Sequence, residues 1–151
     1  MLGQTQFLAA EPPQPPGSEP ARFSARTGRE LVRILVVDDE HLITDTICAI
    51  LNQHGFQAIP AYSAADALES ARDRSPDIVL SDVLMPGMSG VELGIALRRE
   101  FPEVKIFLFS GQAATSEMIH RAEADGHRFE LFPKPIHPDE LIARLRRACA
   151  S

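Results

Sequence analysis

The stretch Ser75–Gly90, SPDIVLSDVLMPGMSG, decides the fold. It opens with a Ser-Pro-Asp turn signal, continues as an apolar run over Ile78–Leu80, and reaches one acidic residue, Asp82, before a loop rich in proline and glycine. An apolar run of this length between turn residues is typical of a buried parallel strand. In open α/β sheets, ligands bind just beyond the carboxyl ends of the strands. Asp82 is therefore the first candidate for a functional residue.

A strand-then-helix pattern repeats along the chain on both sides of this stretch. Apolar, β-branched runs predict strands at 32–37, 56–60, 78–80 (leading to Asp82), 104–109 and 129–133. Helical spacing and cap residues predict helices at 40–54, 63–75, 91–101, 116–124 (with Ser116 as its cap) and from 138 to the C-terminus. Alternation of this kind indicates a parallel sheet with helices on both faces. We expect an α/β fold, a (βα)5 doubly wound five-stranded sheet with the flavodoxin-like order 2-1-3-4-5.

Composition divides the chain into two parts and limits its partners. Residues 1–30 include EPPQPPGSEP and are predicted to be a disordered, proline-rich extension, whereas residues 31–151 form one folded domain. The net charge of −6 argues against a nucleic-acid partner. No apolar run is long enough to span a membrane and no signal peptide is evident. With Cys48 and Cys149 in separate predicted helices and no disulfide pattern, we expect a cytoplasmic location.

Polar residues follow four of the five predicted strands. Asp38 and Asp39 follow the first, Asp82 the third, Ser110 the fourth and Lys134 the fifth. Because the carboxyl ends of parallel strands share one edge of the sheet, these side chains converge. Three carboxylates this close repel one another, and a hard divalent cation such as Mg²⁺ relieves the repulsion. Lysine and a hydroxyl suit phosphate oxygens, and an aspartate can itself attack phosphorus to give an aspartyl-phosphate.

These motifs, in this order, resemble the receiver domain of two-component response regulators (CheY-like). The resemblance rests on the Asp38-Asp39 pair, the SDVLMPGMSG loop that holds Asp82, the Ser110-Gly111 step, and Lys134-Pro135, and it covers residues 31–149. It implies that Asp82 accepts a phosphoryl group. It also implies that Mg²⁺ is the cofactor and that the Lys134-Pro135 bond is cis.

The resemblance also assigns a role to each site residue. Asp38 or Asp39, Asp82 and the Leu84 carbonyl would bind Mg²⁺. Ser110 would sense the phosphoryl group and Lys134 would pair with it. Such a domain is not an enzyme in the ordinary sense, since it catalyses only its own phosphorylation and dephosphorylation.

The resemblance predicts protein partners as well. A sensor histidine kinase or phosphotransfer protein would donate the phosphoryl group. A downstream effector would bind the face made by the fourth helix, fifth strand and last helix, and the domain would be a monomer or a weak homodimer.

Two positions depart from the family pattern. Leu131 stands where the family usually has an aromatic residue three positions before the lysine, and Leu84 is apolar where many relatives are polar.

Two other functions remain open from the sequence. The chain could be a scaffold that keeps the fold and binds partners without phosphorylation, although the complete set of acidic residues and Lys134 argues against this. It could also be a phosphatase with an aspartate nucleophile. Such enzymes typically need a second aspartate two residues further on as general acid, and Leu84 occupies that position. A single-domain phosphoacceptor that switches partner binding is the leading hypothesis.

Overall fold

The computed structural model of the chain describes residues 31–111 and 113–150, and their side chains except at 113–115. The predicted proline-rich extension, residues 1–30, lies outside the described residues, and so does Gln112. No helix in the described part of the chain is long and apolar enough to cross a membrane.

Five strands alternate with five helices along the described chain. The strands are β2 (Arg33–Val37), β3 (Gln57–Ala61), β4 (Ile78–Asp82), β5 (Lys105–Ser110) and β6 (Glu130–Pro133). The helices are α2 (His41–Gln53), α3 (Ala64–Asp73), α4 (Gly90–Glu100), α5 (Ala113–Ala124) and α6 (Pro138–Ala150).

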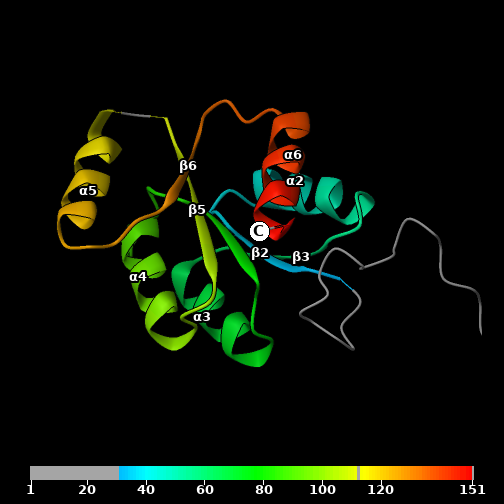
Figure 1. Cartoon of the computed structure of the whole chain (residues 1–151), viewed down its shortest axis with the longest axis horizontal. Coiled ribbons are helices and arrows are strands. Elements are labelled where there is room, and N and C mark those ends of the chain that lie inside the picture. Colours follow the sequence, from blue (N-terminus) through cyan, green and yellow to red (C-terminus); the bar gives the residue numbers. More distant parts are fainter. Residues whose placement is uncertain (1–30, 112, 151) are drawn as a thin grey trace, which may run out of the picture.

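The strands form one parallel sheet in the order β3-β2-β4-β5-β6. Numbered along the chain, this is the order 2-1-3-4-5, so the predicted doubly wound fold is confirmed. Figure 1 shows α2 and α6 on one side of the sheet and α3, α4 and α5 on the other. All five strands therefore present their carboxyl ends to the same edge, where the predicted site residues lie.

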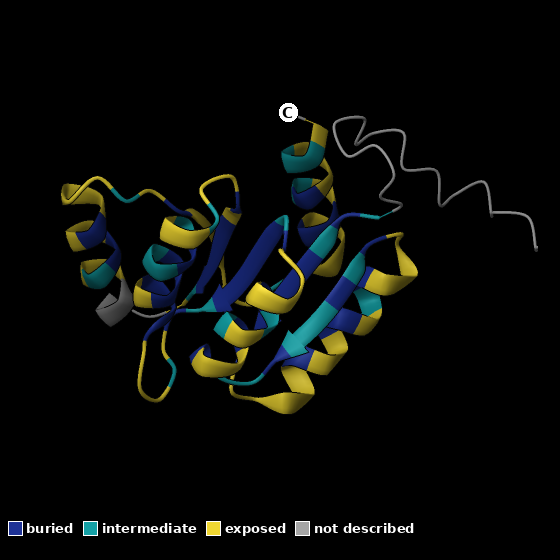
Figure 2. Cartoon of the chain, turned by 90° about the horizontal axis from the view of Figure 1, so that it is seen from below, coloured by how far each residue is buried: buried dark blue, intermediate teal, exposed yellow. Residues whose placement is uncertain are grey.

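Side chains on each strand alternate between two cores. Leu35, Val79 and Leu108 pack on the α3–α4 side, whereas Ile34, Leu80 and their neighbours pack on the α2–α6 side. This alternation is the period of two expected of a strand. Because both faces are covered, the strands are apolar almost throughout, as is typical of parallel sheets. Figure 2 shows the central strands β2, β4 and β5 largely buried and the outer faces of the helices exposed.

The fourth helix differs from its prediction at one end. It was expected to begin at a Ser116 cap, but α5 begins at Ala113. Alanine has the highest helix propensity, and the two alanines of the Ala-Ala-Thr sequence before Ser116 allow an earlier start without a serine cap. The fifth strand begins at Glu130 instead of residue 129. The other bounds shift by one or two residues and leave the topology unchanged.

The loop after β4 is fixed by close backbone packing at Gly90. Its amide donates to the Val83 carbonyl at 2.8 Å, and a Cβ at this position would lie 2.1 Å from the Asp82 carbonyl oxygen. The next helix is capped reciprocally, since the Ser89 hydroxyl accepts from the Glu92 amide and the Glu92 carboxylate accepts from the Ser89 amide. The start of α4 is thereby held against the end of the strand that carries Asp82.

We expect Gly90→Ala to lower the free energy of unfolding by about 3 kcal/mol, because a backbone carbonyl cannot move aside as a flexible side chain can. Gly87→Ala is the matched control. Its Cβ would meet nothing within 4 Å, but its φ of +79° makes alanine cost about 1 to 2 kcal/mol. Urea denaturation of both variants measures the difference. Equal losses of stability would contradict the close approach at Gly90.

Candidate functional site

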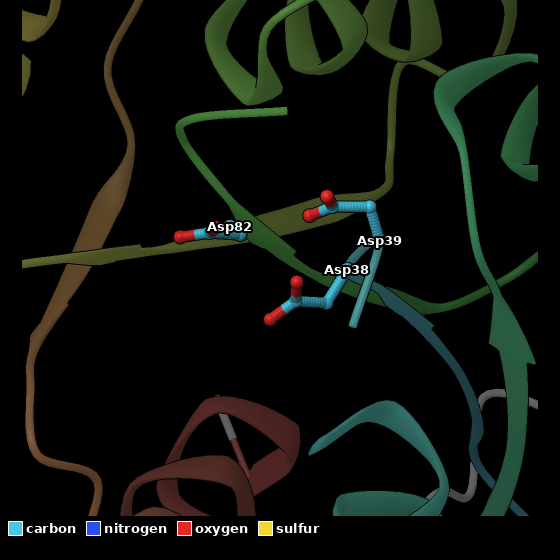
Figure 3. Close-up of side chains that lie close together, drawn as sticks. All are labelled: Asp38, Asp39 and Asp82. Atoms are coloured by element: carbon cyan, nitrogen blue, oxygen red, sulfur yellow. The ribbon is translucent and has the colours of Figure 1, made fainter. Parts of the chain in front are cut away.

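Three carboxylates gather at the carboxyl edge of the sheet. Asp38 and Asp39 follow β2, and Asp82 ends the adjacent strand β4. One carboxylate oxygen from each lies within 4.8 Å of the others. Figure 3 shows Asp38 and Asp39 reaching from one chain segment toward the side chain of Asp82. The structure thus brings together the three aspartates that the sequence predicted to converge.

Asp38 is the buried member of this group, with a relative exposure of 2%. Burial raises the pKa of its carboxyl from 3.8 to about 6. The Glu40 amide, which donates to Asp38 Oδ1 at 3.1 Å, lowers the pKa. The negative charge of Asp82 raises it further, and Lys134 acts in the opposite direction. A carboxylate held here without a nearby dication is therefore costly to ionise.

Lys134 supplies the cation that faces Asp82. Its Nζ lies 2.9 Å from Asp82 Oδ1, and the two side chains are 40% and 14% exposed. The Lys134-Pro135 peptide bond is cis, as the family resemblance implies. Gly111 makes room for the lysine stem, because a Cβ at Gly111 would lie 3.0 Å from Lys134 Cβ. The close approach of Gly111 at the stem and the ion pair with Asp82 at the ammonium thus position Lys134 in the site.

Ser110 ends β5 beside Lys134. Its carbonyl accepts from the Lys134 amide at 3.1 Å, and it lies one residue beyond Phe109, which pairs with Asp82 in the sheet. Its predicted role as a sensor of the phosphoryl group stays a prediction. Leu84 lies in the loop two residues past Asp82, with 43% of its surface exposed, and its role as a carbonyl ligand also stays a prediction.

Thr44 is a positioning residue that the sequence analysis missed. It is fully buried on α2, and its hydroxyl lies 2.9 Å from the Asp38 carbonyl and 3.0 Å from the Glu40 carbonyl. The hydroxyl can donate to either, so it ties α2 to the turn that carries the acidic pair. The signal in the sequence was helical spacing, since Thr44 precedes Ile47, Cys48 and Leu51 by three, four and seven residues and so shares their buried face. Its partners became visible only once the turn was folded.

The donor set fits a hard divalent cation. Carboxylate oxygens are the ligands that Mg²⁺ prefers, and it is usually bound by one or two of them, with waters and phosphate oxygens completing the shell. Asp38 provides an independent reason to expect a dication. A dication beside it would offset both the desolvation cost of the ionised carboxylate and its repulsion from Asp82. Asp38, Asp39 and Asp82 are therefore the residues that would bind Mg²⁺.

An apolar groove adjoins the cluster on the side of α2. It has a volume of about 460 Å³, and its walls come from α2 and from the segment that links β6 to α6. Leu42, which is 79% exposed, and Ile43 line it from α2, and Pro135 and Ile136 line it opposite. Asp38 and Lys134 also border it. The groove therefore leads directly to the charged site.

The edge strand β6 links the site to the face made by α5, β6 and α6. Leu131 lies on this strand with 38% of its surface exposed, and its carbonyl accepts from Arg144 Nη1 of α6 at 2.8 Å. Phe132, the next residue, is buried against Phe107 and Phe109. The exposed position three residues before Lys134 is thus aliphatic here, as the sequence indicated.

Comparison with known proteins gives one consistent result. The family model "Response regulator receiver domain" matches residues 34–146. Among curated relatives, the probable transcriptional regulatory protein TcrX of Mycobacterium tuberculosis is 31% identical over 121 residues, which are 80% of this chain and 51% of TcrX. The phosphate regulon transcriptional regulatory protein PhoB of Escherichia coli is 30% identical over 116 residues, which are 76% of this chain and 50% of PhoB. The chain spans about half the length of these relatives.

Solved structures agree with this result at the level of the fold. A CheY-like response regulator receiver domain protein from Methanospirillum hungatei superposes with a TM-score of 0.71 at 25% identity. The match covers 79% of this chain and 94% of that one. A receiver domain protein from Clostridium thermocellum gives a TM-score of 0.70 at 25% identity, covering 80% and 94% of the two chains.

The raised pKa of Asp38 predicts a pH dependence of stability in metal-free protein. The folded state holds this proton more tightly than the unfolded state, so stability falls as the pH rises from about 4 to about 6. Asp38→Asn removes that fall. The variant should match wild type near pH 4 and exceed it by about 2 to 3 kcal/mol at pH 7.

The measurement is urea denaturation between pH 4 and 8 in EDTA. Asp73→Asn, an exposed aspartate on α3, is the matched control and should leave the pH dependence in place. Parallel stability curves for Asp38→Asn and wild type would contradict the assignment.

Proposed function

The chain belongs to the family of response regulator receiver domains, and on that premise we propose that it accepts a phosphoryl group on Asp82 and then changes its protein partners. One observation carries the proposal above the others. The Asp82 carboxylate lies between a lysine at 2.9 Å and the acidic pair Asp38-Asp39, at the edge of the sheet where ligands bind. A structural aspartate needs neither the lysine nor the additional acidic residues.

The phosphoryl transfer follows from this placement. An Asp82 carboxylate oxygen attacks the phosphorus of a phosphohistidine, the new O–P bond forms, and the P–N bond breaks with its electrons going to the imidazole. Lys134 faces the carboxylate and stabilises the negative charge on the phosphoryl oxygens during the transfer. Bound Mg²⁺ would add charge neutralisation at the same oxygens.

The product changes the partner of Lys134. Before transfer, its ammonium pairs with the Asp82 carboxylate. Afterwards that carboxylate is an acyl phosphate, and the phosphoryl group carries nearly two negative charges. Lys134 and the Ser110 hydroxyl then turn to the phosphoryl oxygens. Because Lys134 directly follows β6, this change reaches the α5–β6–α6 face as a shift between two arrangements of one fold.

The apolar groove beside α2 supports a protein as the phosphodonor. Leu42 is 79% exposed, and it lies with Ile43 in an apolar groove that is bordered by Asp38 and Lys134. An exposed apolar groove of this kind marks a site of protein interaction. A helix of a sensor histidine kinase or phosphotransfer protein, packed there by its apolar face, would bring its phosphohistidine to Asp82. The downstream effector would bind the α5–β6–α6 face, where Leu131 is exposed.

The two alternatives have less support. A scaffold that binds without phosphorylation has no use for the Lys134–Asp82 pair or for a buried Asp38 with a raised pKa. A phosphatase acting on other molecules would need a general acid near the leaving group, and Leu84 is apolar and exposed at the position where such enzymes have one. We therefore propose a phosphoacceptor rather than an enzyme that turns over external substrates.

The relatives are longer than the segment they share with this chain, so their names do not fix the partners of the receiver domain. TcrX and PhoB are named as transcriptional regulators and are about twice as long as the segment they share with this chain. We propose that the receiver domain itself contacts proteins and neither nucleic acid nor membrane, that it is a monomer or weak homodimer, and that it works in the cytoplasm. Transcriptional regulation by TcrX and PhoB would then also use the part of each protein that this chain does not match.

Acetyl phosphate with Mg²⁺ should add one phosphoryl group to the wild-type chain, detected by intact-mass spectrometry. Asp82→Asn should add none, and Lys134→Met should react at least tenfold more slowly because the positive charge at the phosphoryl oxygens is lost. Asp73→Asn, an exposed aspartate on α3, is the matched control and should react as wild type.

Two outcomes would decide against this proposal. Phosphorylation of Asp82→Asn at the wild-type rate would place the phosphoryl group elsewhere, and no phosphorylation of any form would favour the scaffold. Continuous hydrolysis of phosphate esters other than its own acyl phosphate would favour the phosphatase.

Transmission to the output face is testable by NMR with beryllofluoride and Mg²⁺, which together imitate the phosphoryl group. In wild type, the amide signals of Ser110, Leu131 and Lys134 should shift. In Ser110→Ala, beryllofluoride should still bind, but the shift at Leu131 should shrink by at least half, because the hydroxyl that links β5 to the phosphoryl group is missing. Ser75→Ala, at the opposite end of the sheet, is the control. An unchanged Leu131 shift in Ser110→Ala would rule out this route.

A further inference from the structure

A second cavity lies at the opposite end of the sheet from Asp82. Pairing between β5 and β6 begins at Phe107 and Glu130, so the first two residues of β5, Lys105 and Ile106, extend past the end of β6. A cavity of about 880 Å³ occupies this corner, bordered by α4, α5, β6 and α6. Figure 1 shows β5 and β6 running between α4 and α5 on one side and α6 on the other. We call this cavity the edge notch.

The edge notch is rich in positive charge although the chain is acidic. Its lining includes five cationic side chains and only two acidic ones, whereas the net charge of the whole chain is −6. The cationic residues are Arg98, Lys105, Arg128, Arg144 and Arg147. Like charges gathered in one concavity repel one another and attract anions. This concentration of cations is the first reason to expect an anionic ligand.

Some of these cations have partners within the protein and others do not. Arg144 donates to the Leu131 carbonyl, lies 3.4 Å from a Glu130 carboxylate oxygen, and covers the Phe132 ring. Arg98 and Arg128, by contrast, form no ion pair or hydrogen bond with any residue in the described part of the chain.

Arg98 is half-buried as well as without a counter-ion. Its guanidinium lies over the Phe129 ring, 4.8 Å from the centroid, and burial lowers the pKa of the side chain. A partly desolvated cation without a carboxylate is costly, and an incoming anion would offset that cost. Arg98 and Arg128 are therefore the two side chains available to a ligand.

The shape of the edge notch favours a compact ligand with an apolar part. Arg98 and Phe129 belong to the α4 side of the sheet, whereas Arg144 and Phe132 belong to the α6 side, so guanidinium groups approach from two directions. Guanidinium forks match the oxygens of phosphate groups. The volume lies within the range of small-molecule sites, and Ile106 gives the notch an apolar wall. An extended acidic peptide would instead suit a long, open surface.

We propose that the edge notch binds a small phosphorylated molecule with an aromatic body, of the nucleotide class, with Arg98 and Arg128 contacting its phosphate groups and the Arg98–Phe129 stack its ring. The site lies at the opposite end of the sheet from Asp82, and the proposal does not rest on phosphorylation of that residue.

The test is a titration of the full chain in Mg²⁺-free buffer, followed by two-dimensional NMR, with ADP, inorganic pyrophosphate and a glutamate-rich peptide as probes. ADP should shift the amides of Arg98, Phe129 and Leu131 with submillimolar affinity, and pyrophosphate should shift the same amides with lower affinity. The double variant Arg98→Ala/Arg128→Ala should bind ADP at least tenfold more weakly. Loss of Arg98 could disturb the packing of Phe129. The single variant Arg128→Glu leaves Arg98 in place and changes only an exposed side chain, and it should also bind ADP at least tenfold more weakly.

Arg121→Ala and Arg146→Ala are the matched controls, since each removes one exposed arginine that does not line the notch, and both should bind ADP as wild type. Four results would overturn the proposal. They are no shift at millimolar ADP, shifts confined to Asp82 and Lys134, equal affinity for ADP and pyrophosphate, and binding of the peptide alone.

Discussion

The site depends on the repulsion between carboxylates held close together at the end of a buried sheet. Asp38 is nearly inaccessible, its pKa is raised to about 6 by burial and by the charge of Asp82, and Lys134 is the one cation paired with Asp82 in the described structure. An arrangement with an excess of negative charge is unstable by itself. It favours binding of a dication, and it makes the single lysine sensitive to any change in the charge of Asp82.

The rest of the fold holds these carboxylates and Lys134 close together. Adjacent strands β2 and β4 bring their aspartates to the same edge, and Thr44 and the Glu40 amide fix the turn that carries Asp38. Gly90 allows the backbone after Asp82 to fold back within contact of the strand. Lys134 directly follows β6, whose exposed Leu131 belongs to the α5–β6–α6 face. A change of charge at Asp82 therefore has a direct covalent route from Lys134 to that surface.

Much of this architecture could be predicted from the sequence, because its signals are local. The apolar run before Asp82 predicted a buried strand, and the strand–helix alternation predicted the topology. The polar residues after four of the five strands predicted the convergence of four charged side chains. Contacts between distant segments could not be predicted in this way. Thr44 looked like an ordinary helix residue. The edge notch combines Arg98 of α4 with Arg144 of α6 at the corner where β5 extends past β6. The start of α5 at Ala113 was missed because the prediction looked for a serine cap, whereas alanine propensity favours a helix three residues earlier.

The most direct measurement is a crystal structure of the chain with Mg²⁺ and beryllofluoride. Beryllium should be bonded to an Asp82 carboxylate oxygen, Mg²⁺ should be bound by carboxylates of the Asp38–Asp39–Asp82 cluster, and the Lys134 ammonium should have left the Asp82 carboxylate for a fluorine. Beryllofluoride bound at another residue would contradict a phosphoacceptor role for Asp82. A Lys134–Asp82 pair unchanged from 2.9 Å with beryllofluoride in place would contradict the exchange of partners on which signal output depends.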